Sequence, residues 1–115
     1  MKCETLDVWK KSARLSANIY KYFMEFKDYG FKDQITRAGL SVPSNIAEGM
    51  EKDYVKENIR FIEIARGSLA ELATQVYIGM DIQYIEHDIG KDWISEVEEI
   101  FKMLVGLKKN LRNKE

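Results

Sequence analysis

Proline, histidine and cysteine each occur only once among the 115 residues of the sequence. A single cysteine forms no internal disulfide, which excludes a secreted fold held together by disulfides. One histidine and one cysteine are too few for the zinc sites that are built from Cys and His ligands. The scarcity of proline, together with only seven glycines, favours long uninterrupted helices over many short strands joined by turns.

Long apolar runs are missing as well. No stretch of apolar residues is long enough to span a bilayer, and residues 1–4 lack the apolar run of a signal peptide. We therefore expect a cytoplasmic protein without a membrane segment. Hydrophobic residues make up 45% and charged residues 32% of the chain, which is typical of a folded globular protein. The length fits a single domain over residues 1–115.

The charge is nearly balanced in total but uneven along the chain. The formal net charge is −1, from 18 Lys and Arg against 19 Asp and Glu. Residues 61–100 carry 2 basic and 9 acidic side chains, whereas residues 101–115 carry 5 basic side chains and one acidic side chain. This balance argues against a protein that coats nucleic acid with its whole surface, but it leaves a local basic patch open.

The spacing of apolar residues predicts four helices. Apolar side chains recur at steps of three and four, the period of one helix face, over residues 5–27, 33–50, 53–84 and 88–111. The last segment has the most regular pattern, which is typical of left-handed bundle packing. Its apolar residues are Trp93, Val97, Ile100, Leu104, Leu107 and Leu111.

Several residues have properties that suit helix ends. Thr5 or Asp7 can cap the first segment, because either side chain accepts a hydrogen bond from a free backbone N–H. Gly30 suits a left-handed C-terminal cap after that segment. We expect Asp53 to cap the third segment.

Pro43 lies inside the second predicted helix. A proline in a helix interior removes one backbone hydrogen bond and clashes with the preceding turn, at a cost of about 3 kcal/mol in a straight helix. The helix is therefore either kinked near Pro43 or broken into two, with Pro43 in the first turn of the second piece. We favour the kinked helix.

The connections between the predicted helices are short. Short connections make sequential helices antiparallel neighbours. The predicted fold class is therefore all-α, an antiparallel up-down-up-down four-helix bundle. The apolar stripe of the third segment is wider than one helix of such a core normally needs. This width favours either a central position for that helix or a contact with another subunit.

The residue spacing reveals no recognisable catalytic or metal centre. Di-iron sites in bundles need two Glu-x-x-His pairs, but the residue three positions before His87 is Tyr84. Cys3 lies in a terminus that is expected to fray, without a neighbouring histidine to activate its thiol. The glycines are scattered singly, so no glycine-rich phosphate loop is present. We expect no enzyme activity, no cofactor and no metal site.

Residues 41–49 are the most unusual stretch of the chain. If this stretch packs antiparallel to the first half of the third helix, it brings several polar side chains together. We interpret them as a structural hydrogen-bond network that sets the register of the two helices. A ligand or partner site, or an enzyme site, is the alternative. The predicted polar cluster consists of Asn45, Glu48, Arg60, Ser68 and Glu71.

Three stretches resemble a known family. They are LDVWKK at residues 6–11, SVPSNIAEG at 41–49 and RFIEIARGSLAEL at 60–72. They resemble the four-helix-bundle proteins that are encoded in intervening sequences of bacterial 23S ribosomal RNA genes. The resemblance covers nearly the whole chain in order. It implies a compact bundle that assembles as a ring-like homopentamer and has no established enzyme activity.

A related branch of this family is the accessory variability-determinant protein of diversity-generating retroelements. Proteins of that branch are strongly basic and bind a reverse transcriptase and nucleic acid. The present chain, with a net charge of −1, departs from it in charge.

Two functional hypotheses follow from the residues and the resemblance. The first is a non-enzymatic oligomeric scaffold or interaction module, a homopentamer by the family resemblance. The alternative is an accessory protein that binds RNA or a ribonucleoprotein through a basic pole, where the first and last helices meet. The candidate nucleic-acid contacts are Lys10, Lys11, Arg14, Lys108, Lys109 and Arg112.

Overall fold

The computed structural model describes residues 1–114 and consists of helices. A short 3₁₀ turn, η1 (Lys2–Thr5), precedes four α-helices, and no strand occurs within the described range. The all-α prediction is therefore confirmed. The helices are α1 (Asp7–Tyr22), α2 (Tyr29–Met50), α3 (Val55–Asp81) and α4 (His87–Arg112).

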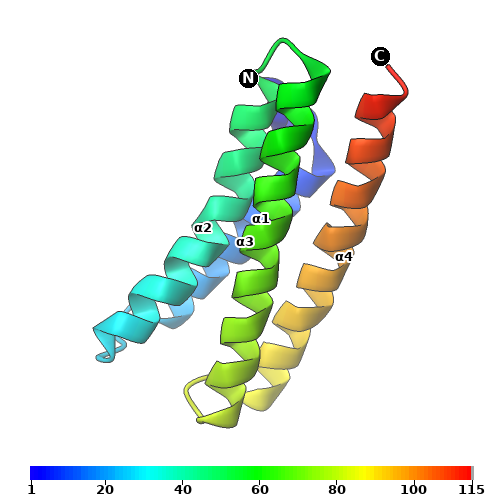
Figure 1. Cartoon of the computed structure of the whole chain (residues 1–115). Coiled ribbons are helices and arrows are strands. Elements are labelled where there is room, and N and C mark those ends of the chain that lie inside the picture. The colour runs from blue at the N-terminus through cyan, green and yellow to red at the C-terminus, as the bar shows by residue number, and fades with distance from the viewer. Residues whose placement is uncertain (115) are drawn as a thin grey trace.

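The four helices lie side by side in an elongated body that measures 46 × 21 × 20 Å. Figure 1 shows that the chain reverses direction at each connection, so that both termini lie at the same end. Each helix contacts its neighbours in chain order, and α4 also contacts α1. The packing is tightest between α2 and α3 and sparsest between α1 and α4. Over residues 1–114, no helix is long and apolar enough to cross a membrane.

The core contains apolar side chains from all four helices. Burying one such side chain contributes about 1.5–3 kcal/mol relative to leaving it in water. The predicted stripe of α4 lies on the core side: Trp93, Val97, Ile100, Leu104 and Leu111 are buried and Leu107 is partly buried. The largest fully buried side chains are Phe23, Leu15, Ile19, Ile35, Ile46, Ile62, Leu69, Leu72, Ile100 and Leu104.

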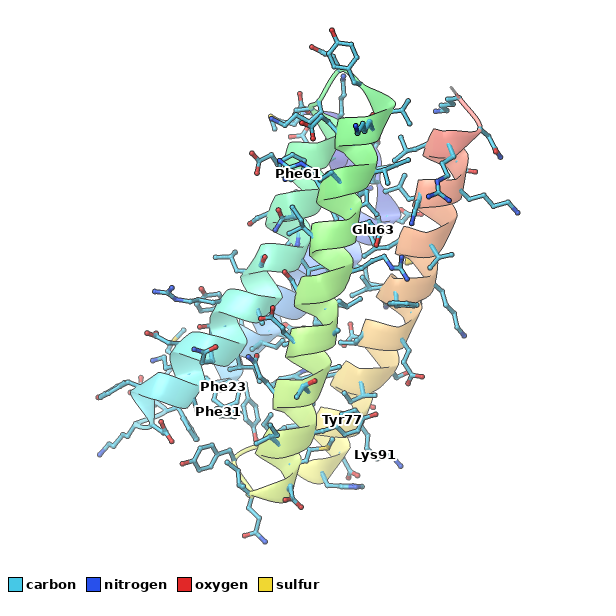
Figure 2. The ribbon with its side chains drawn as sticks, viewed as in Figure 1. Phe23, Phe31, Phe61, Glu63, Tyr77 and Lys91 are labelled. Atoms are coloured by element: carbon cyan, nitrogen blue, oxygen red, sulfur yellow. The ribbon has the colours of Figure 1, made fainter. Side chains whose placement is uncertain are left out.

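An aromatic cluster closes the end of the bundle opposite the termini (Figure 2). Phe26 and Tyr84 meet edge to face with ring centroids 4.7 Å apart. Phe31 lies 5.2 Å from Tyr84 in the same geometry. The Tyr84 hydroxyl donates a 2.7 Å hydrogen bond to Asp28 Oδ2, which lowers the pKa of the Asp28 carboxyl. These contacts join the α1–α2 connection to the α3–α4 connection.

The predicted end of the first helix and the predicted start of the second are both wrong. Helix α1 ends at Tyr22 rather than near residue 27, and α2 begins at Tyr29 rather than at residue 33. Gly30 does not adopt a left-handed conformation but lies in the first turn of α2. Asp28 caps α2 instead, because its Oδ1 accepts a 3.1 Å hydrogen bond from the Phe31 N–H.

The caps expected for α1 and α3 are also wrong. The N-cap residues are Leu6 and Tyr54, and neither makes a capping hydrogen bond with its side chain. The Asn58 amide Nδ2 instead donates to carbonyls at the end of α2 and just after it, to Gly49 at 2.6 Å and to Lys52 at 3.0 Å, and so ties the start of α3 to the end of α2. A tertiary contact thus organises the α2–α3 connection in place of a local cap.

Helix α2 runs without interruption through Pro43. A break into two helices at this position is therefore excluded, and the kink remains a prediction.

The left-handed residue at the end of α3 is not a glycine but Gln83, with φ of 65°. It lets the N–H groups of Tyr84 and Ile85 both reach the Gly79 carbonyl, at 2.8 and 3.0 Å.

We expect Gly49→Ala to destabilise the fold and Gly67→Ala to stabilise it. A Cβ at Gly49 would lie 2.8 Å from Phe61 Cβ and 3.3 Å from the backbone oxygen of Asn58, whereas a Cβ at Gly67 meets nothing within 4 Å. Overpacking costs about 1–3 kcal/mol, and replacing glycine by alanine in a helix gains up to about 1 kcal/mol.

Thermal unfolding followed by circular dichroism at one protein concentration measures both effects. Gly67→Ala is the matched control, since it changes helix propensity alone. A Gly49→Ala variant that melts at or above the Gly67→Ala variant would contradict the close packing of α2 on α3.

Candidate interaction surfaces

The structure joins part of the predicted polar cluster through Ser41. Ser41 Oγ and Ser68 Oγ lie 2.8 Å apart, which connects α2 to α3. The Asn45 amide Nδ2 donates to the carbonyl and to Oγ of Ser41, at 2.8 and 2.9 Å. All three side chains are partly buried. This hydrogen-bonded group fixes the register of the two helices near Pro43.

Glu48, Arg60 and Glu71 do not join this group, since all three are exposed. Arg60 pairs instead with Glu57, at 2.9 Å, and its guanidinium lies 4.8 Å from the Phe61 ring centre. The predicted five-residue cluster therefore does not form as one unit. Phe61 and Ser68 of α3 contact α2, at Gly49 and at Ser41. Arg60 and Glu71 occupy other positions around α3 and are exposed.

The basic residues of α1 lie among acidic partners. Lys10, Lys11 and Arg14 line a groove between α1 and α4 together with Asp7, Glu96 and Glu99. Lys11 Nζ lies 3.3 Å from Glu99 and 3.9 Å from Glu96. The carboxylates of α4 neutralise much of the positive charge of this groove.

The basic residues of α4 line a different groove, between α3 and α4. Lys108, Lys109 and Arg112 surround a hollow of about 350 Å³ together with Arg66, Val105 and Asn113. The predicted basic pole is thus divided into two sets on either side of α4. The sequence interpretation missed Arg66, although it occurs in the conspicuous stretch at residues 60–72.

Glu63 organises the charges at this second groove. Its carboxylate lies 2.6 Å from Lys108 Nζ and 2.9 Å from Arg66 NH1. The hydrogen bond from Lys108, together with Arg66, lowers the pKa of the Glu63 carboxyl, and burial opposes this effect. The Arg66 guanidinium also lies 4.7 Å from the Phe101 ring centre. The two cations therefore hold a fixed arrangement on the α3–α4 surface.

Two further grooves are mainly apolar. One, of about 260 Å³, lies between α3 and α4 and is lined by Leu69, Ala70, Ala73, Val97, Glu98, Phe101 and Lys102. The other, of about 320 Å³, lies between α1 and α2 and is lined by Trp9, Ala13, Ser16, Leu40, Pro43, Ser44 and Ala47. The wide apolar stripe of residues 53–84 predicted extra apolar surface on α3, whereas no residue pattern indicated the groove between α1 and α2.

The residues considered for metal or nucleophilic chemistry lie apart. Among residues 1–114, no three His, Cys, Asp or Glu side chains gather where they could hold a metal ion. His87 is the exposed first residue of α4. Cys3 is buried rather than frayed, as a member of η1. Asn45, Glu48 and Arg60 do not converge on one pocket.

These features define the class of the molecule: a four-helix bundle that presents open grooves between its helices. The chain belongs to the 23S rRNA-intervening sequence protein family, whose model matches residues 4–106. The family predicted from the three sequence stretches is therefore confirmed.

A solved structure has the same fold. It is described as a protein with unknown function from the S23 ribosomal protein family of Bacteroides thetaiotaomicron VPI-5482. The TM-score is 0.83, and the match covers 89% of the present chain and 98% of that chain at 24% identity. A comparison with curated proteins finds no match.

Proposed function

We propose that this protein is a non-enzymatic scaffold or interaction module that assembles as a cytoplasmic homopentamer. The subunit number is the one that the family resemblance implies. The non-enzymatic role is supported by the separation of Asn45, Glu48 and Arg60, the side chains that the sequence suggested for chemistry.

Exposed apolar side chains on two sides of the bundle carry this proposal. Leu40, Tyr77, Ile78, Phe101 and Val105 each expose between 41% and 56% of their surface. Large apolar side chains that gather on an exposed face mark protein–protein contacts in soluble proteins. Association with further copies would remove these side chains from water, at about 25 cal/mol per Å² of apolar area.

Sedimentation velocity across the micromolar range tests the assembly. We expect one species with about five times the subunit mass of 13.4 kDa. A stable monomer at every concentration would contradict the proposal.

A second candidate function is binding to RNA or a nucleoprotein. It is favoured by the groove of Arg66, Lys108, Lys109 and Arg112, in which Lys109 and Arg112 are exposed beside the two cations that pair with Glu63. Phosphate groups pair well with arginine and lysine, and such binding weakens as salt rises.

A titration of structured RNA at two salt concentrations tests this second function. We expect saturable binding at about 50 mM salt that weakens at about 200 mM. The double variant Lys109→Glu/Arg112→Glu should lose this binding, whereas Lys10→Glu/Arg14→Glu should retain it, because Lys10 and Arg14 lie among carboxylates. An absence of saturable binding at low salt would remove the RNA hypothesis.

A further inference from the structure

The two apolar grooves lie on opposite sides of the bundle. The helices follow one another around the bundle in chain order, and only α1 and α4 close the circle. Helices α1 and α2 lie on one side of the bundle and α3 and α4 on the other (Figure 1), so the α1–α2 groove and the α3–α4 groove face away from each other. We call them the α1–α2 face and the α3–α4 face.

The α3–α4 face is an apolar strip that continues toward both ends of its groove. Ala70, Ala73 and Tyr77 are spaced by three and four residues and form one row on α3. Figure 2 shows Tyr77 on the α4 side of α3. On α4, Phe101 and Val105 are one turn apart and expose 41% and 44% of their surface. The strip leads directly into the basic groove that begins at Val105.

The α1–α2 face has the same apolar character on the other side. Trp9 and Ala13 on α1 and Pro43 and Ala47 on α2 form its walls. Leu40 lines the same groove and exposes 47% of its surface.

The charges of the two faces match when two bundles stand side by side in the same direction. Near the end that holds the termini, the α3–α4 face carries Lys109 and Arg112. At the same end, Glu48 lies one turn after Ser44 of the α1–α2 groove, and Glu51, the residue that follows α2, lies one turn after Ala47. Glu51 also accepts a hydrogen bond from the Lys2 backbone N–H at 3.0 Å. In such an arrangement, Lys109 and Arg112 of one copy would face Glu48 and Glu51 of the next.

Near the middle of the bundle, the signs of the charges are reversed: the cation lies beside the α1–α2 face and the carboxylate beside the α3–α4 face. Ser41 and Ser68 are in contact and define one level of the bundle. Arg37 lies one turn before Ser41 on α2, and Glu71 lies one turn after Ser68 on α3, so the two residues share a level. Arg37 is exposed on α2 beside the α1–α2 face, and Glu71 is exposed on α3 beside the α3–α4 face. The charges at the ends of the faces therefore set the direction of neighbouring bundles, and this pair adds to the contact at the middle.

The size of a face is sufficient for a stable contact. A face 46 Å long and 20 Å wide projects roughly 900 Å², and one partner of a standard interface buries about 800 Å². A two-fold contact of the α3–α4 face with itself would leave the α1–α2 face uncovered. A head-to-tail contact covers both faces in every copy, and it gives a ring where the rotation between successive copies closes and an open filament where it does not.

We propose that each copy of this protein packs its α3–α4 face against the α1–α2 face of the next copy, with all bundles pointing in the same direction. This inference rests on the proposed self-assembly and assigns the two surfaces that carry it. The occupant of each apolar groove is a second copy of this chain.

Mixing two interface variants tests the assignment. Leu40→Glu damages the α1–α2 face, and Phe101→Glu damages the α3–α4 face. Every contact in a ring of one variant includes a damaged face, so we expect each variant alone to be monomeric, with a dissociation constant raised at least about thirtyfold, as for the loss of a hot-spot residue. A mixture retains one intact pair of faces and should form a 1:1 heterodimer.

Further variants separate a loss of assembly from a loss of folding and from the effect of an added charge. Asn18→Glu places a carboxylate in the α1–α4 groove, outside both faces, and should leave the assembly unchanged. Circular dichroism checks the helix content of each variant. If Leu40→Glu or Phe101→Glu loses helix content, Ser44→Glu or Tyr77→Glu, exposed on the same faces, replaces it.

The outcomes separate this inference from the proposed function. A wild-type chain that is monomeric overturns both. A wild-type chain that assembles, together with a Leu40→Glu variant that still assembles or a mixture that forms no heterodimer, overturns the face assignment and leaves the scaffold function standing. A 1:1 heterodimer from two monomeric variants supports the assignment.

Discussion

The close approach of α2 and α3 at Gly49 is the constraint on which the rest of the structure depends. A side chain at this position would collide with Phe61 and with the backbone of Asn58. The Asn58 amide bonds the carbonyls of Gly49 and Lys52, which leaves residues 51–54 as a short connection. This contact orients α3 about its own axis, because Phe61 then faces α2 and the neighbouring positions must turn away.

The surface of the molecule follows from this orientation. With Phe61 and Ser68 turned toward α2, the next positions around α3 place Glu63 and Arg66 against α4. Glu63 then draws Lys108 into an ion pair and divides the basic residues of α4 from those of α1. The apolar row that ends in Tyr77 is left on the outside. The grooves and charges that support self-assembly are thus consequences of how α2 and α3 pack.

The sequence predicted the number and type of the helices because their apolar periodicity is long and regular. It failed at the helix ends: Asp28 begins a new helix before Gly30, and the α2–α3 connection is held by the Asn58 amide on carbonyls of α2 and the residues just after it rather than by a cap at Asp53. The polar cluster was only partly predictable, because linear spacing does not give the rotation of α3 that sends Arg60 and Glu71 outward. The family was recognisable from the three stretches at residues 6–11, 41–49 and 60–72, and the second of them ends at Gly49, where α2 packs closely on α3.

Cross-linking in trans measures the central claim most directly, that the α1–α2 face of one copy meets the α3–α4 face of another. In a Cys3→Ser background, which removes the single cysteine, one chain carries Leu40→Cys and a separate chain carries Phe101→Cys. With a short thiol-reactive linker, mixed chains should give the 40–101 product in preference to 40–40 or 101–101 products. Preferential 101–101 cross-links would show a two-fold contact and contradict the account.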